Sequence, residues 1–229
     1  MNFTNEQILV VGATGALGSR FTNQLINSGA KVIGTAHSTE KLEEMNSSVS
    51  DKFVLDLTSD ESINDFINQL KNKYQSLSGV IIASGVVGFS PAEATDPNQL
   101  DKITQINYSG PAKLINSLFP LLKTEGENGS FVLGISGVVV EQVFPGMSAY
   151  TSSKAAFSTY LQSITKEWRR YKIKVTEARL GHTETGLADR AIFGNAPQMP
   201  TGLDPDVVVT KMLEAVLEKK NLISSAEFN

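Results

Sequence analysis

Residues 8–18 read ILVVGATGALG, an apolar run followed by a turn rich in glycine. The apolar run is continuous, as expected of a strand that is buried on both faces. Gly12, Gly15 and Gly18 then follow at intervals of three residues. In a strand–turn–helix unit, such glycines allow a tight turn, a pyrophosphate near the backbone and a helix packed closely on the sheet. A glycine triplet alone is weak evidence, because a turn of this kind can also bind nothing.

The rest of the chain alternates short apolar runs with longer segments of helical spacing. Runs typical of strands follow at residues 31–36, 52–57, 79–84, 130–135, 172–180 and, as a short seventh, 222–224. This alternation implies parallel strands joined by right-handed crossovers, with helices on both faces. The sequence therefore predicts one α/β domain over residues 1–229, a doubly wound parallel sheet (Rossmann fold) with strand order 3-2-1-4-5-6(-7). We expect about residues 1–135 to bind a dinucleotide and about 136–229 to supply catalytic groups and substrate loops.

Capping patterns mark where several helices begin. Thr58 and Glu61 have the spacing of a capping box. Asp-Pro pairs at residues 96–97 and 204–205 predict two further helix starts. Another helix is expected at about residues 148–170.

Composition excludes several classes of function. The chain has 229 residues, a net charge of −4 and no cysteine, so disulfides and thiolate chemistry are excluded. Two histidines make a histidine-based metal centre improbable, and no metal site is expected. The acidic balance argues against nucleic acid binding. No signal-peptide pattern and no membrane-spanning run is found, so we expect a cytoplasmic protein without a membrane contact.

The start of the helix after the glycine turn is expected to hold phosphates, since helix N-termini present free N–H groups. At the end of the second strand, Ala36, His37 and Ser38 precede the first carboxylate, Glu40. An NAD site usually has an acidic residue there, so its absence favours NADP, with NAD possible. His37 can equally be an exposed loop residue. Asp56, at the end of the third strand, can accept from an adenine amino group or cap the next helix.

Four polar residues are candidates for proton transfer. Tyr150 and Lys154 lie one helical turn apart in AYTSSKAAF (149–157), Ser136 follows the fifth strand, and Asn107 lies mid-way along a long predicted helix. The phenol pKa is near 10, and a nearby ammonium favours the phenolate. We expect the Ser136 hydroxyl to bond a carbonyl or alkoxide oxygen, and Asn107 to hold a water that links Lys154 to solvent.

These motifs resemble the short-chain dehydrogenase/reductase family over nearly the whole chain. Its Y-x-x-x-K motif matches Tyr150 to Lys154, its serine fits Ser136 and its asparagine fits Asn107. The P-G-x-x-x-T segment of the family matches LGHTET (180–185), with Leu180 in place of the proline. Two further motifs depart from the pattern: Ala16 stands where most single-domain members have a glycine, and IASG (82–85) stands where the family has N-N-A-G.

The resemblance implies an oxidoreductase that transfers hydride between NADP(H) and a carbonyl or alcohol, with tyrosine as general acid/base. The alternative is a non-catalytic, dinucleotide-binding regulator of the same fold. The expected dinucleotide contacts, from the glycine turn and the resemblance together, are Gly12, Thr14, Gly15, Ala16, Leu17, Gly18, His37, Ser38, Asp56, Leu57, Ala83, Ser84, Gly85, Tyr150, Lys154, Gly181, Thr183 and Thr185.

The resemblance also places the substrate between three segments, residues 86–91, 138–147 and about 186–202. Their side chains are mostly apolar, which favours a small apolar substrate, although each side chain can instead be plain packing. The family further implies a homodimer or homotetramer through the two long helices that carry Asn107 and Tyr150.

Overall fold

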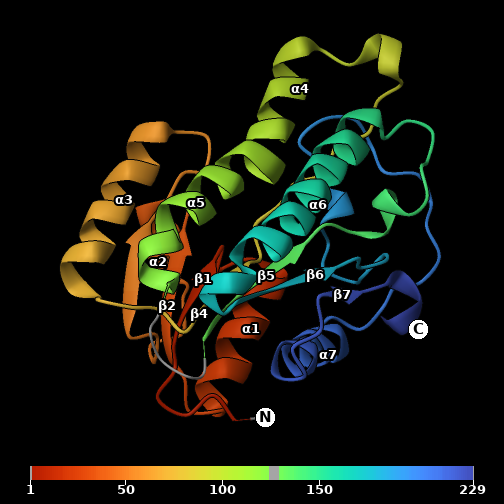
Figure 1. The fold of residues 1–229 in the computed structure, drawn as a ribbon. Coiled ribbons are helices and arrows are strands. Elements are labelled where there is room, and N and C mark those ends of the chain that lie inside the picture. Colours follow the sequence, from red (N-terminus) through yellow and green to blue (C-terminus); the bar gives the residue numbers. More distant parts are fainter. Residues whose placement is uncertain (1, 124–128, 229) are drawn as a thin grey trace.

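A computed structural model describes residues 2–123 and 129–228. Seven parallel strands form one sheet with the order β3-β2-β1-β4-β5-β6-β7, so the predicted fold class and strand order are confirmed (Figure 1). The strands are β1 (Gln7–Val11), β2 (Lys31–Ala36), β3 (Asp51–Val54), β4 (Gly79–Ile82), β5 (Ser130–Ile135), β6 (Ile173–Ala178) and β7 (Leu222–Ile223).

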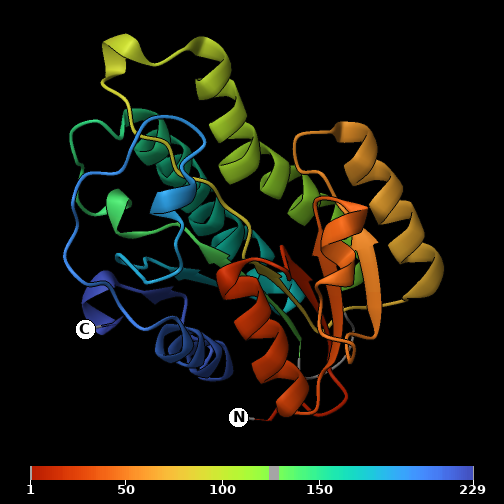
Figure 2. The same cartoon turned by 180° about the vertical axis from the view of Figure 1, so that it is seen from behind.

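Helices cover both faces of the sheet. On one face lie α3 (Asp60–Lys73), α5 (Gly110–Leu122) and α6 (Ser148–Trp168), and on the other α1 (Ala16–Asn27) and α7 (Pro205–Leu217) (Figures 1 and 2). Each face has its own apolar core. One core joins Phe66, Leu114 and Phe157 to the sheet, and the other joins Phe21 and Met212 to it.

The remaining helical segments are short. They are α2 (Thr39–Glu43), α4 (Pro97–Thr104) and single turns at Ala92–Ala94, Val138–Val140, Arg169–Tyr171, Ala188–Arg190 and Ser225–Phe228. The predicted starts of α4 and α7 are confirmed, since Asp96 and Asp204 accept backbone N–H groups as caps. The capping box was placed one residue too early. Ser59 caps α3, because the Thr58 hydroxyl donates to Asp56 instead.

The long helix that carries Asn107 is not regular. A π-helical turn, Gln105–Ser109, joins α4 to α5, and the Gly110 N–H donates to the Gln105 carbonyl, five residues back. The next residue is Pro111, which has no N–H to continue the regular pattern. The wider turn therefore accommodates the proline, and it sets the direction in which the buried Asn107 side chain points.

The topology gathers the polar candidates at one edge. β1, β4, β5 and β6 are neighbours, and their carboxyl ends lead to the glycine turn, IASG, Ser136 and the LGHTET segment. Ligands of doubly wound sheets bind at this edge. Among the described helices, none is both long and apolar enough to cross a membrane.

Candidate active site

The glycine turn after β1 is packed too closely for side chains. Gly12 has a φ of +79°, and a Cβ atom there would lie 3.2 Å from the Ser84 backbone at the end of β4. A Cβ on Gly18 would lie 1.9 Å from the Gly12 carbonyl oxygen. The third glycine therefore allows the start of α1 to pack directly on the end of the strand, as the sequence predicts.

The start of α1 fits an anionic group. Gly15 is the N-cap and has no side chain to satisfy the first N–H groups of the helix, which begins at Ala16. The Ser84 hydroxyl, across the turn from Gly12, is buried and has no hydrogen-bond partner among the residues that the structure describes. Free N–H groups and an unpartnered hydroxyl around a glycine turn are donors that a phosphate would satisfy. Thr14 and Leu17 are partly exposed on the same turn.

The ends of β2 and β3 offer fewer free donors than expected. His37 is exposed, and the Ser38 side chain accepts from the Lys41 N–H as the cap of α2. A hydrogen bond from its own backbone, together with one from Ser38, lowers the pKa of Glu40.

Asp56 has partners within its own turn. It accepts from the Thr58 N–H at 2.8 Å and from the Thr58 hydroxyl at 2.7 Å, and Leu57 beside it is buried. Asp56 thus orders the turn before α3 without capping the helix itself.

Lys154, Asn107 and Gly85 lie together near the ends of β4 and β5. Lys154 is 6% exposed, and its Nζ donates to the Ile135 carbonyl at the end of β5 at 2.9 Å. The Asn107 side chain makes two hydrogen bonds of 2.9 Å with the Val86 backbone. A Cβ on Gly85 would lie 3.3 Å from Lys154 Nζ and 3.5 Å from Asn107 Oδ1. The predicted lysine and asparagine are therefore neighbours, and Gly85 leaves the space that they share.

Tyr150 is partly buried on the first turn of α6, and Lys154 Nζ lies 6.0 Å from its ring centroid. Burial raises the pKa of Tyr150 to about 12 and lowers the pKa of Lys154 to about 8. The sequence led us to expect that the lysine would lower the pKa of the phenol. The structure corrects that expectation for the protein without ligands, because loss of water penalises both charged forms.

The structure also corrects the expected partner of the Ser136 hydroxyl, which points to Glu177 and not toward a substrate. This side chain is fully buried, and its Oγ donates to Glu177 Oε1 on β6 at 2.7 Å. The next residue, Gly137, faces the tyrosine, since a Cβ there would lie 3.9 Å from the Tyr150 hydroxyl oxygen. Gly137 has a φ of +102°, outside the range of an extended strand, and the two neighbouring residues face different environments.

Glu177 is a buried residue that the sequence analysis missed. It lies in the strand that reads KIKVTEARL (172–180), where a single carboxylate interrupts the apolar alternation. That interruption was the available signal, because a charge on a central strand is rarely buried without partners.

The sequence model of the short chain dehydrogenase family matches residues 6–192. This chain belongs to the short-chain dehydrogenase family. By that membership it is an oxidoreductase, and the resemblance stated from the sequence is confirmed.

Individual relatives of this short-chain dehydrogenase are distant in sequence. An uncharacterized oxidoreductase of Staphylococcus saprophyticus is 21% identical over 221 residues, which cover 93% of this chain and 92% of the relative. A short-chain dehydrogenase from Streptomyces avermitilis superposes with a TM-score of 0.85 at 22% identity, over 97% of this chain and 88% of that one. A short chain dehydrogenase from Burkholderia cenocepacia, solved in complex with NADP, gives a TM-score of 0.84 at 21% identity, over 98% and 90%.

In this short-chain dehydrogenase the three expected substrate segments meet beside Tyr150. The Phe89 N–H donates to the Phe193 carbonyl at 3.0 Å, and the Ser90 N–H donates to the Gly146 carbonyl at 2.8 Å. A small apolar cluster joins Ile103, Ala149 and Phe193, and Val86, Tyr150 and Ile192 pack against it. Residues 86–91 thus lie between the other two segments, and they form an apolar wall at the tyrosine.

The segment after β6 folds back on itself at the rim of the site. Thr183 is buried and pairs with Leu203, and its hydroxyl donates to the Gly181 carbonyl at 3.0 Å. The Thr185 hydroxyl donates to the Thr183 carbonyl at 3.3 Å. Gly181 has open space around it: apart from its chain neighbours, Leu203 is the one described residue within 4 Å of a Cβ placed there.

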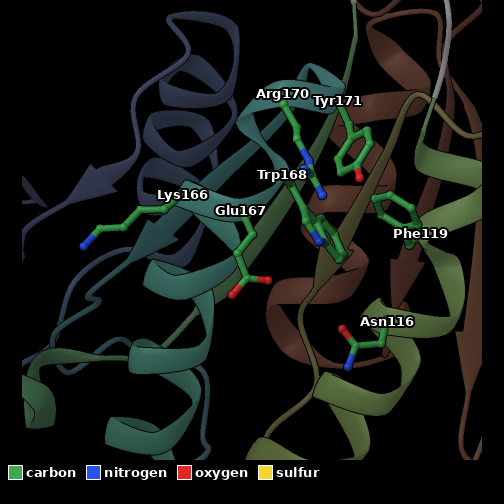
Figure 3. A pocket seen from close by; sticks show the side chains of 7 residues that line it. All are labelled: Asn116, Phe119, Lys166, Glu167, Trp168, Arg170 and Tyr171. Carbon is green, nitrogen blue, oxygen red and sulfur yellow. The ribbon is translucent and has the colours of Figure 1, made fainter.

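A separate cavity of about 710 Å³ lies far from this site, at the opposite end of α6 (Figure 3). It is lined by Asn116, Phe119, Lys166, Glu167, Trp168, Arg170 and Tyr171. Tyr150 and Trp168 are 18 residues apart on one helix, or about 27 Å at 1.5 Å per residue. The cavity therefore takes no part in chemistry at Tyr150.

Proposed function

We propose that the protein transfers hydride between NADP(H) and a small apolar carbonyl or alcohol, with Tyr150 as the proton donor or acceptor. The observation that carries this proposal is the convergence of Tyr150, Lys154 and Asn107 at the strand ends next to the glycine turn. The relative from Burkholderia cenocepacia, which was solved with NADP, supports the choice of cofactor.

The residues that would hold the dinucleotide are those of the glycine turn and the neighbouring strand ends. The uncapped start of α1 and the Ser84 hydroxyl suit the phosphates. The hydride itself is chemistry that the bound dinucleotide supplies. Gly85 keeps the space above Lys154 free of a side chain, which lets a ligand approach that ammonium.

Tyr150 suits proton donation. With a pKa of about 12, its phenol keeps the proton at neutral pH, so the unliganded protein presents the acid form. That form can protonate the oxygen of a carbonyl during its reduction. Oxidation of an alcohol requires the phenolate and is expected to gain rate as pH rises.

The wall beside Tyr150 supports an apolar substrate. Val86, Ile192 and Phe193 contribute side chains to the small cluster that packs at the tyrosine. Arg190, the one obvious anion partner in the neighbouring loop, donates to the Thr185 carbonyl at 3.0 Å and is exposed. A neutral carbonyl compound fits this lining better than a charged one.

NADP is favoured over NAD at the end of β2. Neither Ala36, His37 nor Ser38 carries a carboxylate that would take the ribose hydroxyl or repel a 2′-phosphate. Fluorescence titration tests this choice, with tighter binding of NADPH than of NADH as the expected result. His37→Asp should weaken NADPH binding by about tenfold or more while it spares NADH, because it adds a negative charge at an exposed position. Tighter NADH binding to the unaltered protein would overturn the choice.

One observation favours the alternative, a dinucleotide-binding regulator without catalysis. Position 137 carries no side chain, so it offers the Tyr150 hydroxyl no hydroxyl partner. Tyr150→Phe separates the two functions. If Tyr150 moves the proton, we expect a loss of about 10²–10⁴-fold in kcat on active carbonyl substrates, with NADPH binding retained.

Tyr160→Phe is a matched control for that experiment. Tyr160 lies on the same helix, and its hydroxyl bonds Asn116 and the Ala112 carbonyl, away from the site. We expect this variant to keep full activity. Equal rates for Tyr150→Phe and Tyr160→Phe would overturn the proposed catalysis and favour the regulator.

A further inference from the structure

Glu177 is a buried carboxylate with an unusual number of donors. Its side chain is 4% exposed, and Oε1 alone accepts from Ser136 Oγ at 2.7 Å, Ser158 Oγ at 2.6 Å and Arg179 Nε at 2.9 Å. Gln162 Nε2 approaches the other oxygen at 3.4 Å. A buried charge is costly unless it is paired and hydrogen-bonded, so this arrangement is specifically built.

Two of the donors, Ser136 and Ser158, come from the elements that hold Lys154. Ser136 directly follows Ile135, whose carbonyl accepts the Lys154 ammonium, and Ser158 lies four residues after Lys154 on α6. Residues four apart on a helix share a face. One carboxylate therefore ties the end of β5 to the turn of α6 that follows the lysine.

Position 137 is set by the same contact. The Ser136 N–H donates to the Ala178 carbonyl at 3.0 Å, and its hydroxyl donates to Glu177, so both its backbone and its side chain are fixed on β6. Gly137, the next residue, is the position that faces the Tyr150 hydroxyl. A shift of Ser136 would therefore move both of its neighbours, the Ile135 carbonyl that Lys154 bonds and the Gly137 backbone that faces Tyr150.

Arg179 connects Glu177 to a second carboxylate, Glu141. Its Nε bonds Glu177, and its Nη1 lies 3.7 Å from Glu141 on the loop after β5. Glu141 in turn accepts from the Ser225 hydroxyl near the end of the described chain. Arg179 thus adds a charged partner to the Glu177 oxygen that also accepts from the two serines.

We propose that Glu177 is a positioning residue, which sets the Ile135 carbonyl, and through it the Lys154 ammonium, by holding Ser136 and Ser158. This inference rests on the proposed function, in which Lys154 and Tyr150 act together. It also assigns Ser136 a role through Glu177, in place of the direct contact with substrate that the sequence led us to expect.

The first test needs neither cofactor nor substrate. The ¹³Cε resonance of Lys154, assigned with Lys154→Arg, should titrate near pH 8 in the unaltered protein. Ser136→Ala removes the hydrogen bond from Ser136 to Glu177 without a change of charge. We expect it to admit water to the lysine and move the midpoint up toward the ordinary value of 10.5. Ser158→Ala serves as a second variant, in case the first does not fold.

Thr176→Val is the matched control. Thr176 lies next to Glu177 on β6, is fully buried, and donates its hydroxyl to the Lys220 carbonyl at 2.7 Å, outside the network. It should lower stability and leave the Lys154 titration unchanged. If Ser136→Ala and Ser158→Ala leave that titration as unchanged as Thr176→Val does, the positioning role is wrong.

A double-mutant cycle on kcat separates the two roles of Ser136. If Ser136 acts through Glu177, Ser136→Ala and Glu177→Gln each lower kcat by about tenfold, and the double variant is no slower than the slower single variant. If the two losses multiply, Ser136 contacts the substrate directly and the inference fails. A protein in which Tyr150→Phe keeps full activity would refute the proposed function alone, because the Lys154 titration would still report on Glu177.

Discussion

The buried Lys154 ammonium should make stability depend on pH in a defined window. Burial lowers its pKa from 10.5 to about 8, and the side chain is only 6% exposed, so little solvent screening applies. At 1.36 kcal/mol per pH unit, this difference corresponds to about 3 kcal/mol. Below pH 8 both the folded and the unfolded chain carry the proton, and folding bears the full cost of burying the charge.

The sign follows from proton binding. Between about pH 8 and 10.5 the unfolded chain holds more protons on this lysine than the folded chain, so the free energy of unfolding rises with pH. Relative to low pH, Lys154 should add about 1.4 kcal/mol by pH 9 and about 2.6 kcal/mol by pH 10. Lys154→Met has a side chain of similar length and no charge, so it should lack this rise.

Urea denaturation at pH 7, 8, 9 and 10 measures the effect. The free energy of unfolding of the unaltered protein, minus that of Lys154→Met, is expected to increase steadily from pH 8 upward. The corresponding difference for Thr176→Val should stay constant, since that substitution removes a buried hydroxyl and no charge. A difference for Lys154→Met that stays flat across this range would refute the burial of a charged lysine.

Two further predictions concern glycines at the strand ends. Gly18→Ala should destabilise the fold by about 1–3 kcal/mol in urea denaturation, since its Cβ would lie 1.9 Å from the Gly12 carbonyl oxygen; a neutral result would contradict the packing of α1. Gly137→Ser should cost about 1–2 kcal/mol because φ is +102° there. It should nevertheless raise kcat by placing a hydroxyl beside Tyr150, and a lower kcat would count against Tyr150 as the proton donor.

The fold was predictable because it depends on patterns that extend over many residues, so that no single residue decides them. Alternation of apolar runs and helical segments specifies parallel strands, and the close contact of Gly18 with Gly12 needs only the glycine spacing. Element ends were less predictable. The third strand was expected to reach residue 57 and ends at Val54, because the chain turns at Asp56 to bond Thr58. The π-helical turn at Asn107 depends on how Pro111 is accommodated, which helical periodicity does not register.

The structure brings Tyr150, Lys154 and Asn107 together as the sequence predicts, whereas the direction in which a side chain points was harder to predict. The spacing of Tyr150 and Lys154 places them on one helix face whatever surrounds them. Ser136 differs, because a strand end offers two opposite directions at successive residues and only the backbone path decides between them. That path puts Ser136 against Glu177 and leaves Gly137 facing the tyrosine. From residue type alone, Ser136 was predicted to face the site, since Gly137 has no side-chain group that could take part in catalysis.

The pKa values of Tyr150 and Lys154 could not be inferred from the fact that the two residues are neighbours. With the 6.0 Å from Lys154 Nζ to the Tyr150 ring centroid taken as the charge separation, and an effective dielectric constant near 20, attraction between the ammonium and a phenolate would be worth roughly 3 kcal/mol. That attraction exists only while the lysine is charged. With pKa values of about 8 and about 12, the lysine loses its proton well before the tyrosine does as pH rises. In the unliganded protein the phenolate therefore forms beside a neutral amine, and burial alone sets its cost. For Tyr150 to act as a base near neutral pH, binding of ligands must either keep Lys154 protonated or bring another positive charge to the phenol. The sequence identifies the two titratable groups, whereas the order in which they release their protons depends on the burial that the fold imposes.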